Sequence, residues 1–355
     1  MNLHLYIMYT MKKNLFLVFI IFISLCCSKQ GSNASISPPL PIVYADSFFA
    51  KGADVSWVTE MEAQGIKFFD RAGKQTECIS LMKSLGMNAI RLRVWVNPVN
   101  GYCNVNDVVA KAIRANNLGM KLLIDFHYSD FWADPGKQNK PASWANQDIA
   151  TLQTSVHDHT VSVLNALKSS GVSPAWVQVG NETNDGMLWP EGKASLNMGN
   201  FTKLINSGYD AVKSVFPLAR VVVHISNGYD NALFRWMFDG LKSNGAKWDI
   251  IGMSLYPTST NWDVLDNQCL TNMNDMISRY DKDVMICEVG LPYTDSIASN
   301  SFLKDIINKT KGLKNGRGLG VFYWEPQCYN GWKGYKLGAF DDKGAPTVAL
   351  DAFKP

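Results

Sequence analysis

The stretch Trp176-Val177-Gln178-Val179-Gly180-Asn181-Glu182 indicates how this chain folds. It is a short apolar run with β-branched Val177 and Val179, which predicts a buried strand. Gly180 lets the backbone turn, or be approached closely, where that strand ends. A carboxylate at Glu182 is costly to bury unless it is hydrogen-bonded or functional. A helix N-cap or a solvated loop acid would also account for it.

A second stretch, Val284-Met285-Ile286-Cys287-Glu288, has the same design, and similar runs recur along the chain. We expect strands at residues 51–56, 88–96, 121–127, 176–179, 221–225, 249–255, 284–287 and 320–324. Amphipathic segments at 76–85, 107–117 and 153–169 are expected helices between them. This alternation predicts an α/β fold, a single (β/α)8 TIM barrel. A doubly wound open sheet, the alternative, would need a glycine-rich phosphate loop after an early strand, and none is present.

Polar and aromatic residues interrupt the apolar pattern at one place in each unit, where the strand ends. They are Asp54, Arg91, Trp95, His127, Asn181, Glu182, His224, Asn227, Tyr256, Glu288, Trp324 and Glu325. In a barrel these strand ends line a single face, where active sites are built. We therefore expect the two glutamates, Glu182 and Glu288, to face one another across a cleft on that face.

The chemistry of these strand ends favours glycoside hydrolysis. The chain has no HExxH, GxSxG, Walker or clustered Cys/His motif. Two carboxyl groups suffice to cleave a glycosidic bond, one as an acid and the other as a nucleophile or base. Aromatic rings offer flat apolar faces to sugars. We expect platforms from Trp95, Trp132, Trp189 and Trp324, although packing in the core would also explain tryptophans.

The N-terminal part of the chain has the pattern of an export signal rather than that of a folded domain. Lys12 and Lys13 precede an apolar run, 15–23, that is too short to span a bilayer but suits a secretory signal. A cysteine follows it, so we expect a signal peptide at 1–27 of the lipoprotein type, lipidated at Cys27 or Cys26. Ordinary secretion is the alternative. Residues 28–47, rich in Ser and Pro, predict a flexible tether, and 48–355 the catalytic barrel.

Charge and cysteine content exclude some classes. The formal charge is +3, and removal of residues 1–26 with Lys12 and Lys13 leaves +1. A nearly neutral surface does not hold nucleic acid by bulk electrostatics. Five cysteines remain after residue 27, namely Cys78, Cys103, Cys269, Cys287 and Cys328. They allow at most two disulfides, and the spacing leaves their pairing open.

Several longer motifs resemble one family, the arabinogalactan endo-β-1,4-galactanases of glycoside hydrolase family 53. The matching stretches are Gly52-Ala53-Asp54-Val55-Ser56, Arg91-Leu92-Arg93-Val94-Trp95-Val96-Asn97-Pro98, Asp125-Phe126-His127-Tyr128-Ser129-Asp130-Phe131-Trp132-Ala133-Asp134-Pro135, Val179-Gly180-Asn181-Glu182, Leu188-Trp189-Pro190, Asn227-Gly228, Ser254-Leu255-Tyr256-Pro257 and Phe322-Tyr323-Trp324-Glu325-Pro326. The run from His127 to Pro135 is the most specific of them. The resemblance extends over nearly all of 49–351.

The resemblance implies a retaining mechanism with catalytic acids at the ends of strands four and seven. Glu182 then corresponds to the acid/base and Glu288 to the nucleophile, with carboxyl groups ~5–5.5 Å apart. Such a pair is expected to titrate as a coupled unit. Asn181 resembles the residue that hydrogen-bonds the 2-hydroxyl, and Arg91 and Tyr256 would hold the nucleophile ionised. The expected substrate-binding set is Asp54, Arg91, Trp95, His127, Asp130, Trp132, Asn181, Trp189, Asn227, Tyr256 and Trp324. For Asn181, His127 and Tyr256 a purely structural hydrogen bond is the alternative.

Two segments depart from the family pattern, Val289-Gly290-Leu291-Pro292 after Glu288 and Thr183-Asn184-Asp185 after Glu182. Some bacterial members carry calcium in a loop after strand seven, but here 293–301 offers only Asp295 as a carboxylate, so we expect no metal and no cofactor. The expected partner is polysaccharide, β-1,4-galactan, with contact to a membrane only through the N-terminal lipid, and we expect a monomer. Two alternatives stay open: a barrel glycosidase acting on mannan or cellulose, and a lipid-anchored glycan-binding protein without activity.

Overall fold

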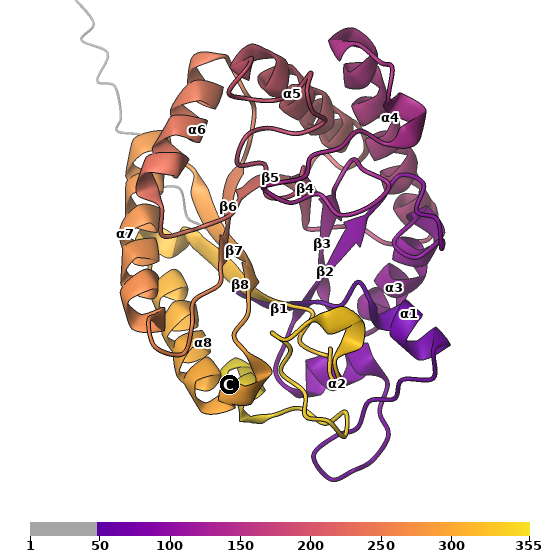
Figure 1. Cartoon of the computed structure of the whole chain (residues 1–355), viewed down its shortest axis with the longest axis vertical. Coiled ribbons are helices and arrows are strands. Elements are labelled where there is room, and N and C mark those ends of the chain that lie inside the picture. The colour runs from indigo at the N-terminus through magenta and orange to yellow at the C-terminus, as the bar shows by residue number, and fades with distance from the viewer. Residues whose placement is uncertain (1–47) are drawn as a thin grey trace, which may run out of the picture. The chain divides into compact units, whose positions relative to one another are not determined.

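The computed structural model describes residues 48–355, so the expected signal peptide and tether lie outside the described residues. Eight parallel strands close a barrel in the order of the sequence, which confirms the expected (β/α)8 fold (Figure 1). The strands are β1 Ala50–Asp54, β2 Ala89–Val94, β3 Lys121–Phe126, β4 Trp176–Val179, β5 Arg220–Ile225, β6 Ile250–Leu255, β7 Asp283–Val289 and β8 Gly318–Trp324.

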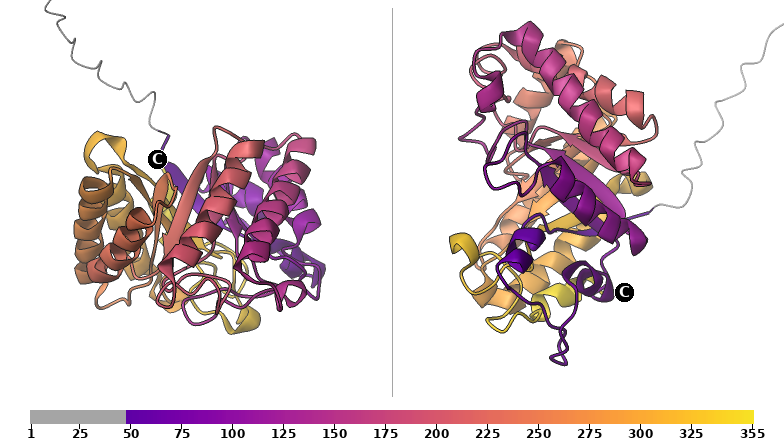
Figure 2. Two further views of the ribbon diagram at one scale, coloured as in Figure 1. Left: turned by 90° about the horizontal axis from the view of Figure 1, so that it is seen from above. Right: turned by 90° about the vertical axis from the view of Figure 1, so that its right-hand side faces the viewer.

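Helices surround the strands on the outside of the barrel, as two further views show (Figure 2). They are α1 Val58–Ala63, α2 Cys78–Ser84, α3 Val105–Asn117, α4 Ile149–Ser169, α5 Met198–Val215, α6 Asn231–Ser243, α7 Trp262–Tyr280 and α8 Ser296–Lys311. Polar side chains cap several N-termini. Asn104 accepts a hydrogen bond from the backbone N–H of Asp107, and Asp148 accepts one from Thr151. The expected helices 76–85, 107–117 and 153–169 correspond to α2, α3 and α4.

Side chains alternate between the inside and the outside of the barrel along each strand. An apolar layer fills the interior with residues from all eight strands: Ala50, Ala89, Leu123, Trp176, Val222, Ile250, Met285, Cys287 and Phe322. Trp176 on β4 meets Phe322 on β8 across the barrel, with ring centroids 6.3 Å apart. Two residues further along β2, β3 and β4, the side chain that points inward is again buried but is polar. These residues are Arg91, Asp125 and Gln178. The interior is therefore closed by packing at one level and lined with polar groups next to the strand ends.

A β-bulge in β7 interrupts this alternation just before Glu288. Met253 pairs with Ile286, but the next residue of β6, Ser254, pairs with Glu288. Cys287 is thus an extra residue on the β7 side. Ile286 packs in the outer core between strands and helices, so strict alternation would turn Glu288 outward too. The bulge re-aims Glu288 to the inside, a use of bulges that is common next to active sites.

The five cysteines of the described residues are all free and buried, so neither of the two possible disulfides forms in 48–355. Burial raises the pKa of the Cys269 thiol and keeps it protonated, like a small apolar side chain. Within the same range no helix is both long enough and apolar enough to cross a membrane.

Candidate active site

Glu182 and Glu288 line one pocket of about 250 Å³ at the carboxyl ends of the strands. The sequence-based expectation that the two acids meet on this face therefore agrees with the geometry. The pocket is lined by His127, Trp132, Ala133, Asp134, Asn181, Glu182, Tyr256, Glu288, Trp324, Tyr335 and Leu337. Glu182 follows β4 after Gly180 and Asn181 and adopts a left-handed backbone conformation, with φ of 43°. Such a conformation is unusual for a residue other than glycine, and it aims the side chain away from the strand's own course.

Glu288 is almost fully buried and both its carboxylate oxygens have partners. Nη2 of Arg91 lies 2.8 Å from Oε1, and the hydroxyl of Tyr256 donates to Oε2 at 2.7 Å. Arg91 and Tyr256 thus contact Glu288 as the sequence led us to expect. Both contacts favour the ionised form of this carboxylate, because a guanidinium and a hydroxyl donor stabilise negative charge.

Glu182 has a weaker set of partners. The Ser254 hydroxyl donates to Oε1 at 2.7 Å. The Ser254 oxygen in turn lies 2.8 Å from Nε2 of His224, which places the His224 ring proton on Nε2. Burial lowers the pKa of His224 well below its ordinary value, so this ring is neutral. A neutral hydroxyl thus orients Glu182, and within residues 48–355 no cation contacts its carboxylate directly.

Negative charge is in excess around these two acids. Arg91 contacts three carboxylates, Asp54, Asp125 and Glu288, at 2.8 Å each. Burial raises the pKa of Glu182 to about 6, and the Ser254 hydrogen bond and the Arg91 charge oppose this rise. Burial also raises the pKa of Glu288, opposed by Arg91 and reinforced by the charge of Glu182. The pair therefore retains a proton in the neutral range and titrates as a unit.

Asn181 and His127 lie in the pocket wall with their polar atoms largely occupied by protein. Oδ1 of Asn181 accepts from Nη2 of Arg91 at 2.9 Å, and its amide donates to the carbonyl of Ala133 at 2.9 Å. Nδ1 of His127 accepts from the indole of Trp95 and from the backbone of Ala133, both at 3.2 Å. Its proton is then on Nε2, which lies 3.0 Å from Asp125. An amide carries two N–H groups, so Asn181 has one left for a ligand.

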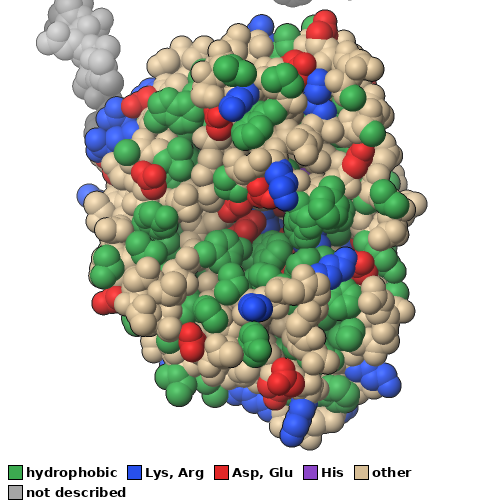
Figure 3. Space-filling model, viewed as in Figure 1, with side chains coloured by type: hydrophobic (Ala, Val, Ile, Leu, Met, Phe, Trp, Pro, Cys, Tyr) green, Lys and Arg blue, Asp and Glu red, His purple; other side chains and the backbone are tan. Residues whose placement is uncertain are grey.

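An aromatic groove leads away from the catalytic pocket. A neighbouring hollow of about 500 Å³ shares Trp132, Trp324 and Tyr335 with that pocket. A third hollow of about 330 Å³ shares Trp57, Phe131, Trp132 and Lys333 with the second. The three hollows are therefore continuous. In the space-filling view, acidic side chains lie at the centre of a hollowed face with hydrophobic side chains beside them (Figure 3).

The other residues expected to bind substrate lie outside the catalytic pocket. Asp54 is fully buried beneath it, where its carboxylate accepts from Ser56 and Arg91. Asp130 accepts from the backbones of Asn97 and Ala142 and lines the third hollow with Trp95. The indole of half-buried Trp189 donates to the carbonyl of Asp185, and Asn227 is exposed after β5. Neither of these last two is part of the pocket or the groove.

Sequence reasoning missed four residues that build the site: Asp125, Gln178, Ser254 and Tyr335. Gln178 is fully buried and donates to Asp125 at 2.6 Å and to Asn181 at 3.1 Å. The period of two along β4 would have revealed it, because Gln178 shares the inward face with Trp176. Tyr335 comes from the loop after β8 and carried no comparable signal in the sequence.

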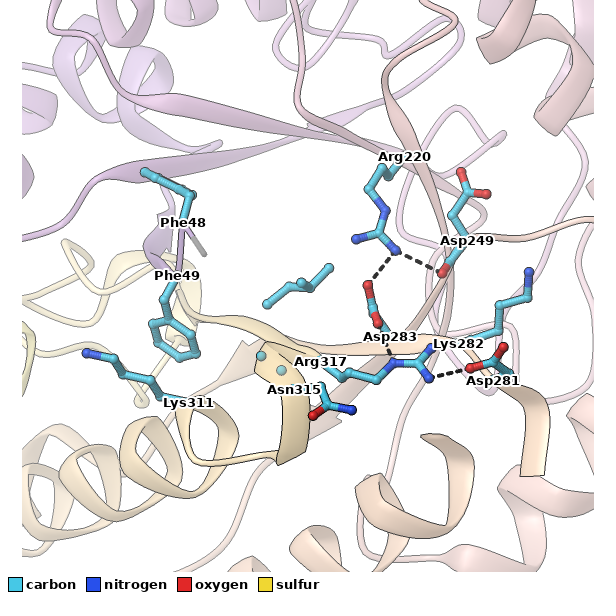
Figure 4. Close-up of a pocket in the computed structure, with 13 residues that line it drawn as sticks. Phe48, Phe49, Arg220, Asp249, Asp281, Lys282, Asp283, Lys311, Asn315 and Arg317 are labelled. Carbon is cyan, nitrogen blue, oxygen red and sulfur yellow. Dashed lines mark hydrogen bonds and ion pairs between the residues drawn. The ribbon is translucent and has the colours of Figure 1, made fainter. Parts of the chain in front are cut away.

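Another cavity, about 480 Å³, lies at the opposite end of the barrel, and Figure 4 shows the residues that line it. Four of its charged residues pair with one another: Arg220 with Asp283 at 2.7 Å, and Arg317 with Asp281 at 2.5 Å and Asp283 at 2.7 Å. It is lined by residues at the amino ends of the strands, which in barrels serve stability rather than catalysis. This cavity is therefore not the candidate site. In residues 48–355 no group of three or more His, Cys, Asp or Glu side chains could hold a metal ion.

These features together define a barrel glycosidase, because two carboxyl groups with different partners meet beside a groove of aromatic rings. The sequence model of the family described as glycosyl hydrolase family 53 matches residues 50–353. The chain belongs to this family, and the resemblance seen in its motifs is thereby confirmed.

Similar sequences and solved structures point to the same family. A probable arabinogalactan endo-beta-1,4-galactanase A of Neosartorya fischeri is 34% identical over 298 residues, which are 78% of this chain and 83% of the relative. A chain from the structures of two fungal beta-1,4-galactanases superposes with a TM-score of 0.79 at 28% identity, over 85% of this chain and 98% of that chain. The GH53 catalytic domain of Ignisphaera aggregans gives 0.78 at 28% identity, over 88% and 98%.

Proposed function

We propose that this enzyme is an endo-acting, retaining hydrolase of β-1,4-galactan, the type I arabinogalactan side chain of pectin. The observation that carries the proposal is the meeting of Glu182 and Glu288 in one pocket with unlike partners. The choice of glycan rests on the names of the relatives. The Neosartorya fischeri protein is described as a probable arabinogalactan endo-β-1,4-galactanase A, and the Thermothelomyces thermophilus protein as an arabinogalactan endo-β-1,4-galactanase.

The partners of the two acids support a division of labour. Glu288 receives a guanidinium and a hydroxyl donor, whereas Glu182 receives one hydroxyl. The proton that the pair retains therefore belongs on Glu182, and Glu288 is the anion. In the first step Glu288 attacks the anomeric carbon while Glu182 gives its proton to the departing oxygen. In the second step Glu182 takes a proton from water, whose oxygen displaces Glu288 and leaves the sugar with its original configuration.

The groove supports action within a chain rather than at its end. It continues past the catalytic pocket through two further hollows lined by Trp57, Trp132 and Trp324. An open run of aromatic faces can hold several sugar units of one polymer. We therefore propose cleavage inside the galactan, with the expected substrate-binding residues Trp95, Trp132 and Trp324 contributing to the groove.

Two alternatives remain testable. The fold neighbours include xylanase 10C of Cellvibrio japonicus, at 12% identity and a TM-score of 0.61, but such a likeness shows the fold alone. It favours neither mannan nor cellulose as substrate. An inactive glycan-binding protein would have no need of two acids in one pocket, each held by its own hydrogen bonds.

Digestion of galactan tests the proposal directly. A ladder of intermediate oligosaccharides, sized over time, is expected from the wild-type enzyme. Galactose alone from the outset would indicate trimming from the chain end, and products from mannan or cellulose but not galactan would favour another glycan. Glu182→Ala and Glu288→Ala should each lose several orders of magnitude in rate while still binding.

Azide separates the two roles. With an activated aryl galactoside, azide should rescue Glu182→Ala and give a β-galactosyl azide, because attack follows the covalent intermediate. It should rescue Glu288→Ala with the α-azide, because azide then takes the nucleophile's place. The opposite pattern would exchange the two assignments, and a single inverting step in the wild type would refute retention.

We further infer that the enzyme is exported and anchored by lipid at Cys27 or Cys26, which supports activity on a polymer too large to enter the cell. It is proposed to act as a monomer. Mass spectrometry of the mature N-terminus should find an acylated cysteine, whereas a free amino terminus would indicate ordinary secretion.

A further inference from the structure

Two arginines of β2, Arg91 and Arg93, are both fully buried and both face a buried glutamate. Arg91 contacts the catalytic Glu288. Arg93 contacts Glu325, with Nη1 2.5 Å from Oε1, and neither residue of this second pair lines the catalytic pocket. The surroundings of Arg93 indicate what it does.

The Arg93 guanidinium lies beneath the tryptophans of the groove. Its central carbon is 4.4 Å from the ring centroid of Trp132, 5.0 Å from that of Trp57 and 5.2 Å from that of Trp95. Nε and Nη2 are buried without a hydrogen-bond partner in the described part of the chain. Aromatic faces are attractive to a guanidinium at these distances, so the rings take the place of the missing acceptors.

Glu325 joins this cation to the backbone of the groove. Its carboxylate oxygens accept from the backbone N–H of Trp57 at 3.1 and 3.2 Å, and from the Gln327 amide at 2.5 Å. Glu325 also follows Trp324 directly, in a left-handed conformation with φ of 49°. The ion pair therefore connects the ends of β1, β2 and β8 under one aromatic floor.

The rings above the ion pair hold one another edge to face. Trp57 lies 5.4 Å from Trp132 and 5.2 Å from Trp324, and Trp95 lies 5.1 Å from Trp132. All four tryptophans line the hollows that lie beside the pocket of Glu182 and Glu288. Tilting of any one ring would change the surface offered to a sugar, and Arg93 touches three of the four.

We propose that Arg93, together with Glu325, is a positioning residue that sets the angles of the tryptophan floor and so determines how tightly the groove binds the sugar rings of the polymer. The inference rests on the proposed function, in that the groove is taken to hold glycan. Arg93 acts through the tryptophans and does not itself touch the glycan. Its loss should weaken binding of the chain and leave bond cleavage nearly intact.

Arg93→Lys tests this with the smallest change. A lysine keeps the positive charge for Glu325 but loses the flat guanidinium that stacks on the rings. We expect KM for β-1,4-galactan to rise about tenfold and kcat to change less than about threefold. The matched control is Arg91→Lys, two residues earlier on the same strand and equally buried, where the loss should fall on kcat.

The double variant Arg93→Met/Glu325→Gln removes both charges without leaving one unpaired, and is expected to raise KM in the same way. A wild-type KM in both variants, or a loss confined to kcat, would overturn the proposal. So would failure of both to show a cooperative melting transition, because Arg93 would then serve the fold. If the wild type cleaves another glycan, the proposed function fails, and the same comparison on that glycan still decides the role of Arg93.

Discussion

Glu288 stands opposite Ser254 in the pairing of β7 with β6, and the Ser254 hydroxyl donates to the other proposed catalytic acid, Glu182, at 2.7 Å. One serine thus adjoins both carboxyl groups. The position depends on the bulge at Cys287, because regular alternation through 286–288 would turn Glu288 to the outward face that Ile286 occupies. The proposed catalytic pair therefore depends on strand register as much as on residue identity.

Ser254→Ala should shift the pH dependence of catalysis. The hydrogen bond from Ser254 lowers the pKa of Glu182 below the value that burial alone would give. Without it the pKa rises, so the general acid keeps its proton to higher pH. We expect the alkaline limb of the kcat/KM profile to move up by roughly one pH unit. Ser226→Ala is the control, because Ser226 contacts Asn184 and neither acid. A shift to lower pH in Ser254→Ala would contradict this account of the hydrogen bond.

Gly180→Ala should damage the turn that presents Asn181 and Glu182. Gly180 has a φ of +83°, and an added Cβ would lie 2.6 Å from the Cγ2 atom of Thr183. Gly171 has a similar φ of +73° but open space around it. The left-handed conformation alone costs a residue with a side chain about 1–2 kcal/mol. Chemical denaturation should show that loss for Gly171→Ala and a larger one for Gly180→Ala, with reduced kcat only in the latter. Equal losses would mean that Thr183 moves aside freely.

Asp266 of α7 should make stability depend on pH. It is fully buried, neither carboxylate oxygen has a hydrogen-bond partner in the described residues, and Lys309 lies 3.4 Å away. Burial, with Asp305 adding to it, raises its pKa from 3.8 to about 7. Between about pH 4 and pH 7 the folded protein thus holds a proton that the unfolded chain has lost. Stability therefore falls as pH rises through this window and stays low above it.

Asp266→Asn removes this effect because asparagine does not titrate. At pH 8 the variant should be more stable than the wild type by roughly 1–3 kcal/mol, and below about pH 4 the two should be alike. Thermal melting at both pH values measures the difference. Asp263→Asn, an exposed residue on the same helix, is the control and should change little at either pH. A variant that is less stable at pH 8 would show that the Asp266 anion is well accommodated.

Removal of metal ions should leave the enzyme unchanged. The segment 293–301 after β7 offers Asp295 as its one carboxylate, which is too few for calcium. We expect EDTA to alter neither kcat on galactan nor the melting temperature, and added Ca²⁺ to restore nothing. Stoichiometric calcium in the purified protein, with a lower melting temperature after chelation, would contradict this expectation.

Much of the architecture followed from local pattern. Val177 and Val179 made β4 recognisable, and the phase of the polar residues at successive strand ends predicted a single functional face. Arg91 and Tyr256 were expected beside Glu288, and both contact it. Asp54 and Asp130 looked the same in the sequence, yet their carboxylates bind Arg91 and loop backbone rather than face the pocket. The position of a polar residue at a strand end does not tell which way its side chain points.

The sequence by itself determined the closed barrel and the pair of glutamates, because strand and helix periodicity and the residues at strand ends are local properties of the chain. Only the tertiary structure decided that Glu288 turns inward, because the bulge at Cys287 appears only when β7 is paired with β6. It also decided that Arg93 and Glu325, 232 residues apart, meet under the tryptophans. Contacts between distant segments follow from closure of the barrel, which no short stretch of sequence encodes.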